Sequence, residues 1–127
     1  MLARQHDALY RLRQQDGDPR ITDRGGWQPP ASSYRVTLLP AELDYRVLYT
    51  ALHALAIDLP ADASGVVFDF SGVTRLGGPW GCHFAMLMVF ARDRDLTVLL
   101  DGLAGQPLAL ADLFFRSGSL GRRLLIV

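Results

Sequence analysis

The stretch VVFDF at residues 66–70 decides the fold, because its apolar side chains fall on both faces of an extended chain and only Asp69, near the end, is polar. This pattern is typical of a central strand that is covered on both sides, as strands are in mainly parallel sheets. A glycine-containing turn region, Ser71 to Gly78, follows it. We therefore expect helices and further strands on both sides of this segment.

Upstream, a half-buried strand is predicted over residues 34–38, where apolar side chains alternate with Arg35 and Thr37. Apolar residues then recur at helical spacing over residues 47–55, and Pro60 closes that segment. One amphipathic helix should therefore connect this strand to the central one.

Downstream, Pro79 suits the first turn of a helix, and residues 80–92 are apolar almost all round the helix. Residues 96–100 read as a third, buried strand. Pro107 suits the start of another helix, and residues 123–127 form a predicted last strand.

Together these segments predict one small α/β domain over residues 34–127, with a mainly parallel four-stranded sheet and alternating helices. Residues 1–33 are predicted to be an N-terminal arm or linker, because residues 16–33 are dense in glycine and proline. Within the arm, leucines at helical spacing favour a short helix over residues 3–14.

The composition limits the class of protein. The chain has 127 residues, half of them hydrophobic, which suits a single domain with a real core. Its 13 basic and 13 acidic residues balance, so no broad field attracts nucleic acid. No apolar run reaches the roughly 18 residues of a membrane helix, so no direct membrane insertion is expected.

Cysteine and lysine usage narrows the chemistry. Cys82 is the single cysteine, which excludes an internal disulfide and fits a reducing, cytoplasmic compartment. The sequence contains no lysine, so Schiff-base chemistry and a P-loop are excluded. We expect no cofactor.

Three short stretches carry a family likeness. LPAELD at residues 39–44 precedes the first helix, VVFDFSGVT occupies residues 66–74, and Leu110–Leu113 with Phe114 lie in the last helix. In this order and spacing they resemble STAS domains, the modules shared by sulfate transporters and anti-sigma factor antagonists. The resemblance covers residues 34–127 and implies a non-enzymatic regulatory module that binds protein partners.

The family's phosphorylation switch is missing from the matching turn. In the family this turn carries a serine that a partner kinase phosphorylates. Here the matching residues are 76–81, and Gly78 and Pro79 occupy the two serine positions. The resemblance therefore implies that the usual switch is lost. Ser71 and Thr74 are nearby hydroxyls, which we expect to form hydrogen bonds within the turn.

A rigid apolar corner replaces the phosphorylated serine. Pro79 and Trp80 form it, and a large aromatic side chain beside a glycine-rich turn is the kind of anchor that interface hot spots favour. We expect a constitutive contact with a protein partner. The predicted docking residues are Gly77, Gly78, Pro79, Trp80, His83, Met86 and Phe90.

The helix over residues 80–92 has more apolar side chains than one face can bury. The face toward the sheet takes Phe84, Leu87 and Ala91, with either Trp80 or Met88. The side chains that need other cover are Met86, Val89 and Phe90. A partner or a second copy is the favoured cover, because methionines and aromatics suit adaptable contacts. The alternative is the N-terminal arm folded back over them.

Cys82 is the strongest enzymatic candidate. The triplet Gly81-Cys82-His83 near a helix start resembles a nucleophile elbow, where helix amides lower the pKa of a thiol. Adjacent helical residues point in different directions, however, so His83 is poorly placed as a base. The alternative is that Cys82 is a small buried hydrophobe.

Other polar residues admit a site but are explained more simply. Carboxylates at the carboxyl ends of strands can hold Mg²⁺, although capping and turn roles are the favoured interpretation. The carboxylates are Asp44, Asp69 and Asp101. Glycines before a helix can cradle a phosphate, but a tight turn is the simpler use. These glycines are Gly72, Gly77, Gly78 and Gly81. The histidines His6, His53 and His83 lack metal-ligand spacing.

The sequence thus predicts a stand-alone STAS-like protein that docks a regulatory partner, such as an anti-sigma factor kinase, through residues 77–90. A second hypothesis with the same fold is an accessory subunit bound to a transporter ATPase. A hypothesis from another class is a thiol-dependent enzyme that uses Cys82.

Overall fold

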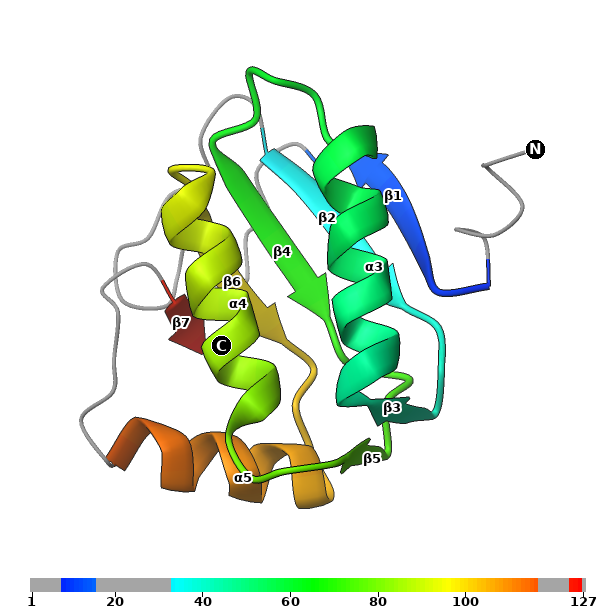
Figure 1. The fold of residues 1–127 in the computed structure, drawn as a ribbon, viewed down its shortest axis with the longest axis vertical. Helices are drawn as coiled ribbons and strands as arrows, with labels where there is room; N and C mark the ends of the chain where they lie inside the picture. Colours follow the sequence, from blue (N-terminus) through cyan, green and yellow to red (C-terminus); the bar gives the residue numbers. More distant parts are fainter. Residues whose placement is uncertain (1–7, 16–32, 117–123, 127) are drawn as a thin grey trace.

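The computed structural model describes residues 8–15, 33–116 and 124–126. These residues form a five-stranded sheet, a two-stranded sheet and three helices (Figure 1). The strands are β1 (Tyr10–Gln14), β2 (Ser33–Leu38), β3 (Glu42–Asp44), β4 (Gly65–Asp69), β5 (Arg75–Gly77), β6 (Thr97–Asp101) and β7 (Leu124–Ile126). The helices are α3 (Tyr45–Asp58), α4 (Cys82–Asp93) and α5 (Gly105–Arg116).

The main sheet confirms the predicted α/β class. Its strand order is β1-β2-β4-β6-β7. The four strands from β2 to β7 pair in parallel, and β1 pairs antiparallel with β2 at the edge. The central strand β4 is buried on both faces, as its apolar sequence predicts: Phe68 and, on the opposite face, Val67 are both fully buried.

Residues 10–14 differ from the expectation for the N-terminal arm. The helix predicted over residues 3–14 is wrong for these residues, which form β1 and extend the sheet. Tyr10 and Leu12 alternate with two arginines at the period of a strand, and Tyr10 is 3% exposed because it packs into the core. Its hydroxyl group also donates a hydrogen bond to Asp58 at the end of α3. Residues 1–7 and 16–32 lie outside the described residues.

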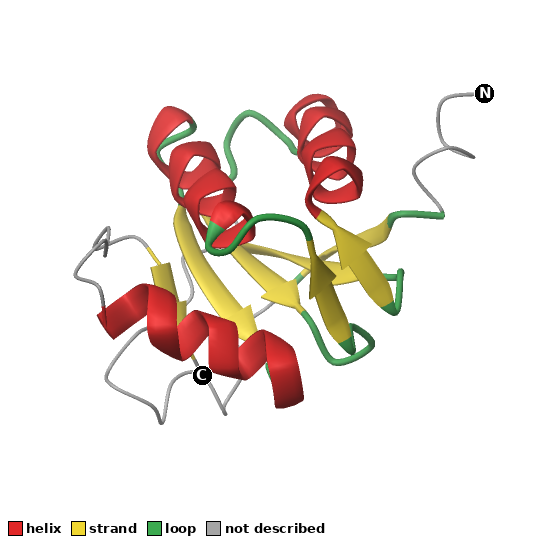
Figure 2. Cartoon of the chain, turned by 60° about the horizontal axis from the view of Figure 1, so that its bottom comes forward, coloured by secondary structure: helices red, strands yellow, loops and turns green. Residues whose placement is uncertain are grey.

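Two helices cover one face of the sheet. α3 and α4 lie side by side over the central strands, with Leu48 and Leu87 fully buried beneath them (Figure 1). α5 lies near the carboxyl end of the strands, next to the start of α4 (Figure 2), where Phe114 packs against Phe84. Within the described part of the chain, no helix is long and apolar enough to cross a membrane.

The small β3/β5 sheet lies at the carboxyl end of the main strands. In it, Asp44 is opposite Gly77, so the starts of α3 and of the turn before α4 are held together. Gln106 of α5 bonds to both backbone groups of Leu76, at 2.8 Å and 2.9 Å. This small sheet therefore fixes α3, α4 and α5 relative to one another at the end of the domain where the predicted docking residues lie.

Candidate functional site

The turn between β5 and α4 is shaped by two glycines with positive φ. Gly78 has a φ of 110°, and a Cβ atom there would lie 2.4 Å from Cδ1 of Tyr45. Gly81 has a φ of 76°, and a Cβ atom there would lie 3.2 Å from Cδ2 of Phe114. L side chains rarely adopt such angles, so this turn depends on glycine at both positions.

Pro79 and Trp80 lie between these glycines, and with Gly78 they form what we call the Trp80 corner. Trp80 is 56% exposed, and its ring centroid lies 6.4 Å from that of Phe114. Phe114 is buried and lies 5.6 Å from the ring of Phe84. The indole therefore stands on a buried aromatic stack while more than half of its surface faces solvent.

The start of α4 differs from the sequence prediction. Pro79 was expected in the first turn of the helix, but α4 begins at Cys82, and Pro79 precedes it. The left-handed conformation of Gly81 interrupts the helix, and the Cys82 amide donates a hydrogen bond to the Pro79 carbonyl at 3.3 Å. Trp80 consequently belongs to the turn and not to a helix face.

His83, a predicted docking residue, is buried. It is 2% exposed, and its Nε2–H group donates to the Leu43 carbonyl oxygen at 2.8 Å. Burial lowers the pKa of His83, although the Leu43 bond and the Asp44 charge act in the opposite direction. His83 thus ties α4 to β3 and is not part of the exposed surface.

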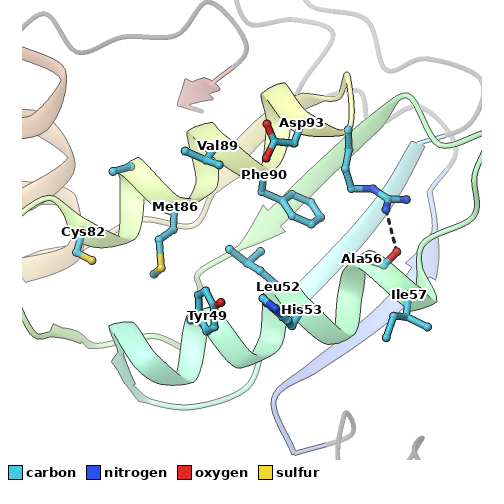
Figure 3. A pocket seen from close by; sticks show the side chains of 12 residues that line it. Tyr49, Leu52, His53, Ala56, Ile57, Cys82, Met86, Val89, Phe90 and Asp93 are labelled. Carbon is cyan, nitrogen blue, oxygen red and sulfur yellow. Dashed lines mark hydrogen bonds between the residues drawn. The ribbon is translucent and has the colours of Figure 1, made fainter.

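Met86 and Phe90, two further predicted docking residues, lie on a groove between α3 and α4 (Figure 3). Phe90 was expected to need external cover, but it is 8% exposed and meets Phe68 edge-on, whereas Met86 is half-buried. The groove has a volume of roughly 660 Å³. We call it the α3/α4 groove, and its lining residues are Tyr49, Leu52, His53, Ala56, Ile57, Cys82, Ala85, Met86, Val89, Phe90, Asp93 and Arg94.

The rims of the groove expose large apolar side chains. Ile57 is 79% exposed, Tyr49 55% and Val89 45%. The Tyr49 ring also packs against His53, with centroids 4.5 Å apart. Val89 is therefore exposed, as the sequence predicts. Trp80 is not among the lining residues, so the predicted docking residues divide between two surfaces.

Cys82 lines the groove at the start of α4 and carries a free, half-buried thiol. Its neighbour His83 directs its ring to Leu43 in the core, so the two side chains do not form a nucleophile and base. His53 lines the same groove from α3 and packs on Tyr49. Within the described part of the chain, neither histidine is hydrogen-bonded to the Cys82 thiol.

Two of the three carboxylates that were weighed as magnesium ligands come together, but around an arginine. Arg35 donates to Asp69 at 3.0 Å and to Asp101 at 3.2 Å. Its Nε also donates to Gln15 at 2.7 Å. Burial acts to raise the pKa of Asp69, but hydrogen bonds from Ser71 and the Arg35 charge outweigh it and lower that pKa. The guanidinium thus occupies the place that a cation would take.

Asp44, the third of these carboxylates, lies elsewhere and caps α3, as the favoured interpretation predicts. Its carboxylate accepts a hydrogen bond from the Arg46 amide at 2.8 Å, and this bond is the main reason that the pKa of Asp44 is lowered. Among the described residues, no group of three His, Cys, Asp or Glu side chains is placed to hold a metal ion. His6 lies outside the described residues.

The glycines considered for a phosphate cradle are spread along the chain. Gly72 lies in the loop after β4, Gly77 ends β5, and Gly78 and Gly81 shape the turn before α4. That turn requires glycine at the last two positions. A tight turn is the role that the sequence predicts for them.

Sequence reasoning missed Arg35 and the α3 side of the groove. Arg35 was taken as the solvent-facing residue of a half-buried strand, yet it is 4% exposed. The aspartates that end β4 and β6 were the available signal, because a buried cation is expected to have such partners. Tyr49 and His53 lie off the apolar spacing over residues 47–55, which is the available signal for a groove rim on α3.

No protein-family model matches this chain, and no curated protein is detectably similar to it. The STAS resemblance therefore depends on the short stretches over residues 39–44, 66–74 and 110–114 alone.

Proposed function

We propose that this protein is a non-enzymatic regulatory module that docks onto a protein partner through the Trp80 corner. The observation that carries the proposal is an indole that is 56% exposed and stands on the buried rings of Phe114 and Phe84. Tryptophan is enriched among the residues that contribute most to binding energy at protein interfaces.

The corner is preorganised, which favours binding. Gly78 and Gly81 hold positive φ angles on either side of Pro79 and Trp80, and proline fixes its own φ. Little conformational freedom is then lost when a partner covers the indole, so more of the contact energy contributes to affinity.

The corner carries no residue that a kinase could modify. Gly78 and Pro79 have no hydroxyl group, and the hydroxyl of the nearby Thr74 donates to the Ala41 carbonyl at 3.0 Å. This bond joins the turn to the segment before β3, and does not stay within the turn as the sequence suggested. We infer that docking is constitutive, without a serine-phosphorylation switch.

The class of partner comes from the STAS resemblance. It points to an anti-sigma factor kinase or a related switch protein, in the cytoplasm. The alternative within the same likeness is that this chain is an accessory subunit bound to a transporter ATPase. In either case we expect the partner to present a pocket for Trp80. Identification of the captured partner separates them.

Affinity capture from native lysate tests the proposal. Wild type is compared with Trp80→Asp, and Ile57→Asp is the matched control, because it places the same charge on an exposed apolar position of α3. We expect a kinase-like regulator or a transporter ATPase with wild type and Ile57→Asp, and its loss with Trp80→Asp. Equal recovery with Trp80→Asp would remove the corner as the docking site. Circular dichroism would show that all three proteins are folded.

A further inference from the structure

The α3/α4 groove has the size and shape of a small-molecule site. Its volume of roughly 660 Å³ lies within the range in which proteins bind small organic ligands, about 300 to 1,000 Å³. Along α4 the lining runs from Cys82 to Arg94, so the hollow is about 18 Å long at the rise of an α-helix. A hollow of this length between two helices favours an elongated occupant over a compact one.

The lining of the groove is apolar along most of its length and charged at one end. The apolar part includes the buried side chains of Leu52 and Phe90. The carboxylate and the guanidinium of the lining belong to Asp93 and Arg94, which both lie where α4 ends (Figure 3). Pockets that combine an apolar lining with a few placed polar groups use those groups to orient a ligand. An occupant with a polar head and an apolar tail matches this division.

The guanidinium of Arg94 is available to an anion. Arg94 is half-buried, and it donates to the Ala56 carbonyl at 2.8 Å, a bond that holds it across the end of the groove (dashed line in Figure 3). A guanidinium has five N–H donors, so this bond leaves others for a ligand. Among the residues that the structure describes, no carboxylate pairs with Arg94, whereas Asp93 pairs with Arg92 at 3.6 Å. The charge of Asp93 is thus already matched, and that of Arg94 is not.

We propose that the α3/α4 groove binds a medium-chain fatty acid, with its carboxylate on Arg94 and its alkyl chain extended along α4 toward Cys82. Arginine and carboxylate form paired, charge-assisted hydrogen bonds, and the partial burial of Arg94 strengthens them. The alkyl chain covers apolar side chains of the lining that are otherwise exposed, Tyr49 and Val89 among them. Trp80 is not among the lining residues, so this site is separate from the Trp80 corner.

Arg94 decides between an acid and a neutral ligand, because the carboxyl ends of both helices lie at the same end of the groove. The bond from Arg94 reaches the last turn of α3, and α4 itself ends at Asp93. The carboxyl end of a helix carries about half a negative charge, which repels a carboxylate. Without the charge of Arg94, the groove should accept a neutral ligand at least as well as an acid.

Isothermal titration calorimetry of the full chain with decanoate and with decanol tests the proposal, because the two probes share an alkyl chain and differ in charge. Wild type is expected to bind decanoate more tightly than decanol by about tenfold or more. Arg94→Gln should lose this preference and keep its affinity for decanol. Arg75→Gln is the matched control, because it removes a positive charge from an exposed position outside the groove, and it should keep the preference.

A second pair of variants tests the place of the alkyl chain. Val89 is 45% exposed and lines the groove, so Val89→Glu sets a carboxylate beside the chain and should weaken decanoate binding by about tenfold or more. Leu113→Glu is the matched control, because this leucine is 49% exposed on α5 and is not part of the lining, and its variant should bind as wild type does. Thermal unfolding verifies that the variants fold.

Two results would overturn the proposal. One is a wild-type chain that binds neither probe, or binds decanoate no more tightly than decanol, which would leave the groove for a protein partner. The other is a preference for decanoate that survives in Arg94→Gln, which would place the carboxylate elsewhere. Neither result affects docking through Trp80, because capture with Trp80→Asp is scored separately.

Discussion

The Trp80 corner and the α3/α4 groove both expose apolar side chains, but they do so in opposite shapes. The corner presents a single protruding indole that is held from beneath by Phe114. The groove is hollow, and its exposed side chains Tyr49, Ile57 and Val89 stand on the rims. A protruding anchor concentrates binding energy in one residue, whereas a hollow distributes it over many contacts. The two surfaces should therefore respond differently to single substitutions.

The two surfaces also differ in what supports them. The corner depends on backbone conformation at Gly78 and on an aromatic stack that reaches α5. The groove depends on two helices that are tied at their ends by His83 and Arg94. Substitutions can therefore disturb one surface while they leave the other intact.

Phe114→Ala should have the largest effect, and it should act on the corner. Phe114 is buried against Phe84 and beneath Trp80, so its removal leaves a cavity and should lower the free energy of unfolding by about 3 to 5 kcal/mol. Urea unfolding measures the loss. In a Trp27→Phe background, Trp80 is the single indole, and its emission should shift to longer wavelength.

Leu113→Ala is the control for Phe114→Ala. Leu113 lies on the same helix but is 49% exposed, so its removal should change the free energy of unfolding by less than about 1 kcal/mol. Equal losses in the two variants would show that Phe114 does not act as the platform of the corner.

Gly78→Ala should have the next largest effect, because it disturbs the corner through the backbone. A Cβ atom would lie 2.4 Å from Tyr45, and the φ of 110° is unfavourable for alanine, so we expect a loss of about 2 to 3 kcal/mol. Gly77→Ala is a matched control, since its Cβ atom would meet Asp44 at an ordinary 3.7 Å and no positive φ is involved. Similar unfolding midpoints for the two variants would contradict this account.

The order of elements could be predicted from the sequence because hydrophobic period is a local property. The apolar run at 66–70 and the periodic helix at 47–55 both appear in the structure as predicted. β1 could not be predicted in the same way, because its five residues are stabilised by pairing with β2 and by the burial of Tyr10.

The site was only partly predictable, because its geometry depends on contacts between distant residues. Trp80 could be singled out, since an aromatic in a glycine-rich turn is a local signal. The burial of His83 could not, because it results from a bond to Leu43, 40 residues away. Arg35 was misassigned for the same reason, since its carboxylate partners come from two other strands.

Lowering the pH should lower the free energy of unfolding, because His83 is buried near the start of α4. The pKa of His83 is lowered in the folded state from 6.5, so the unfolded chain takes up the proton first. Stability should therefore fall as the pH drops below 6.5, by at most about 1.4 kcal/mol per pH unit, until the folded pKa is reached.

Urea unfolding at several pH values, compared between variants, isolates this contribution. His83→Gln keeps a donor for the Leu43 carbonyl but does not titrate, so the slope below pH 6.5 should be smaller than in wild type. An unchanged slope in His83→Gln would refute the assignment to His83.

Arg94→Ala should have the smallest effect and should act on the other end of the groove. It removes the 2.8 Å bond to the Ala56 carbonyl, which lies in the last turn of α3, and should lower the free energy of unfolding by about 1 kcal/mol. Arg94→Lys should recover part of this loss, because lysine can still donate to that carbonyl. If Arg94→Ala left the stability unchanged, the groove would be held in shape by the sheet beneath it. The distinction between a groove tied at its ends and a corner fixed by its backbone would then fail.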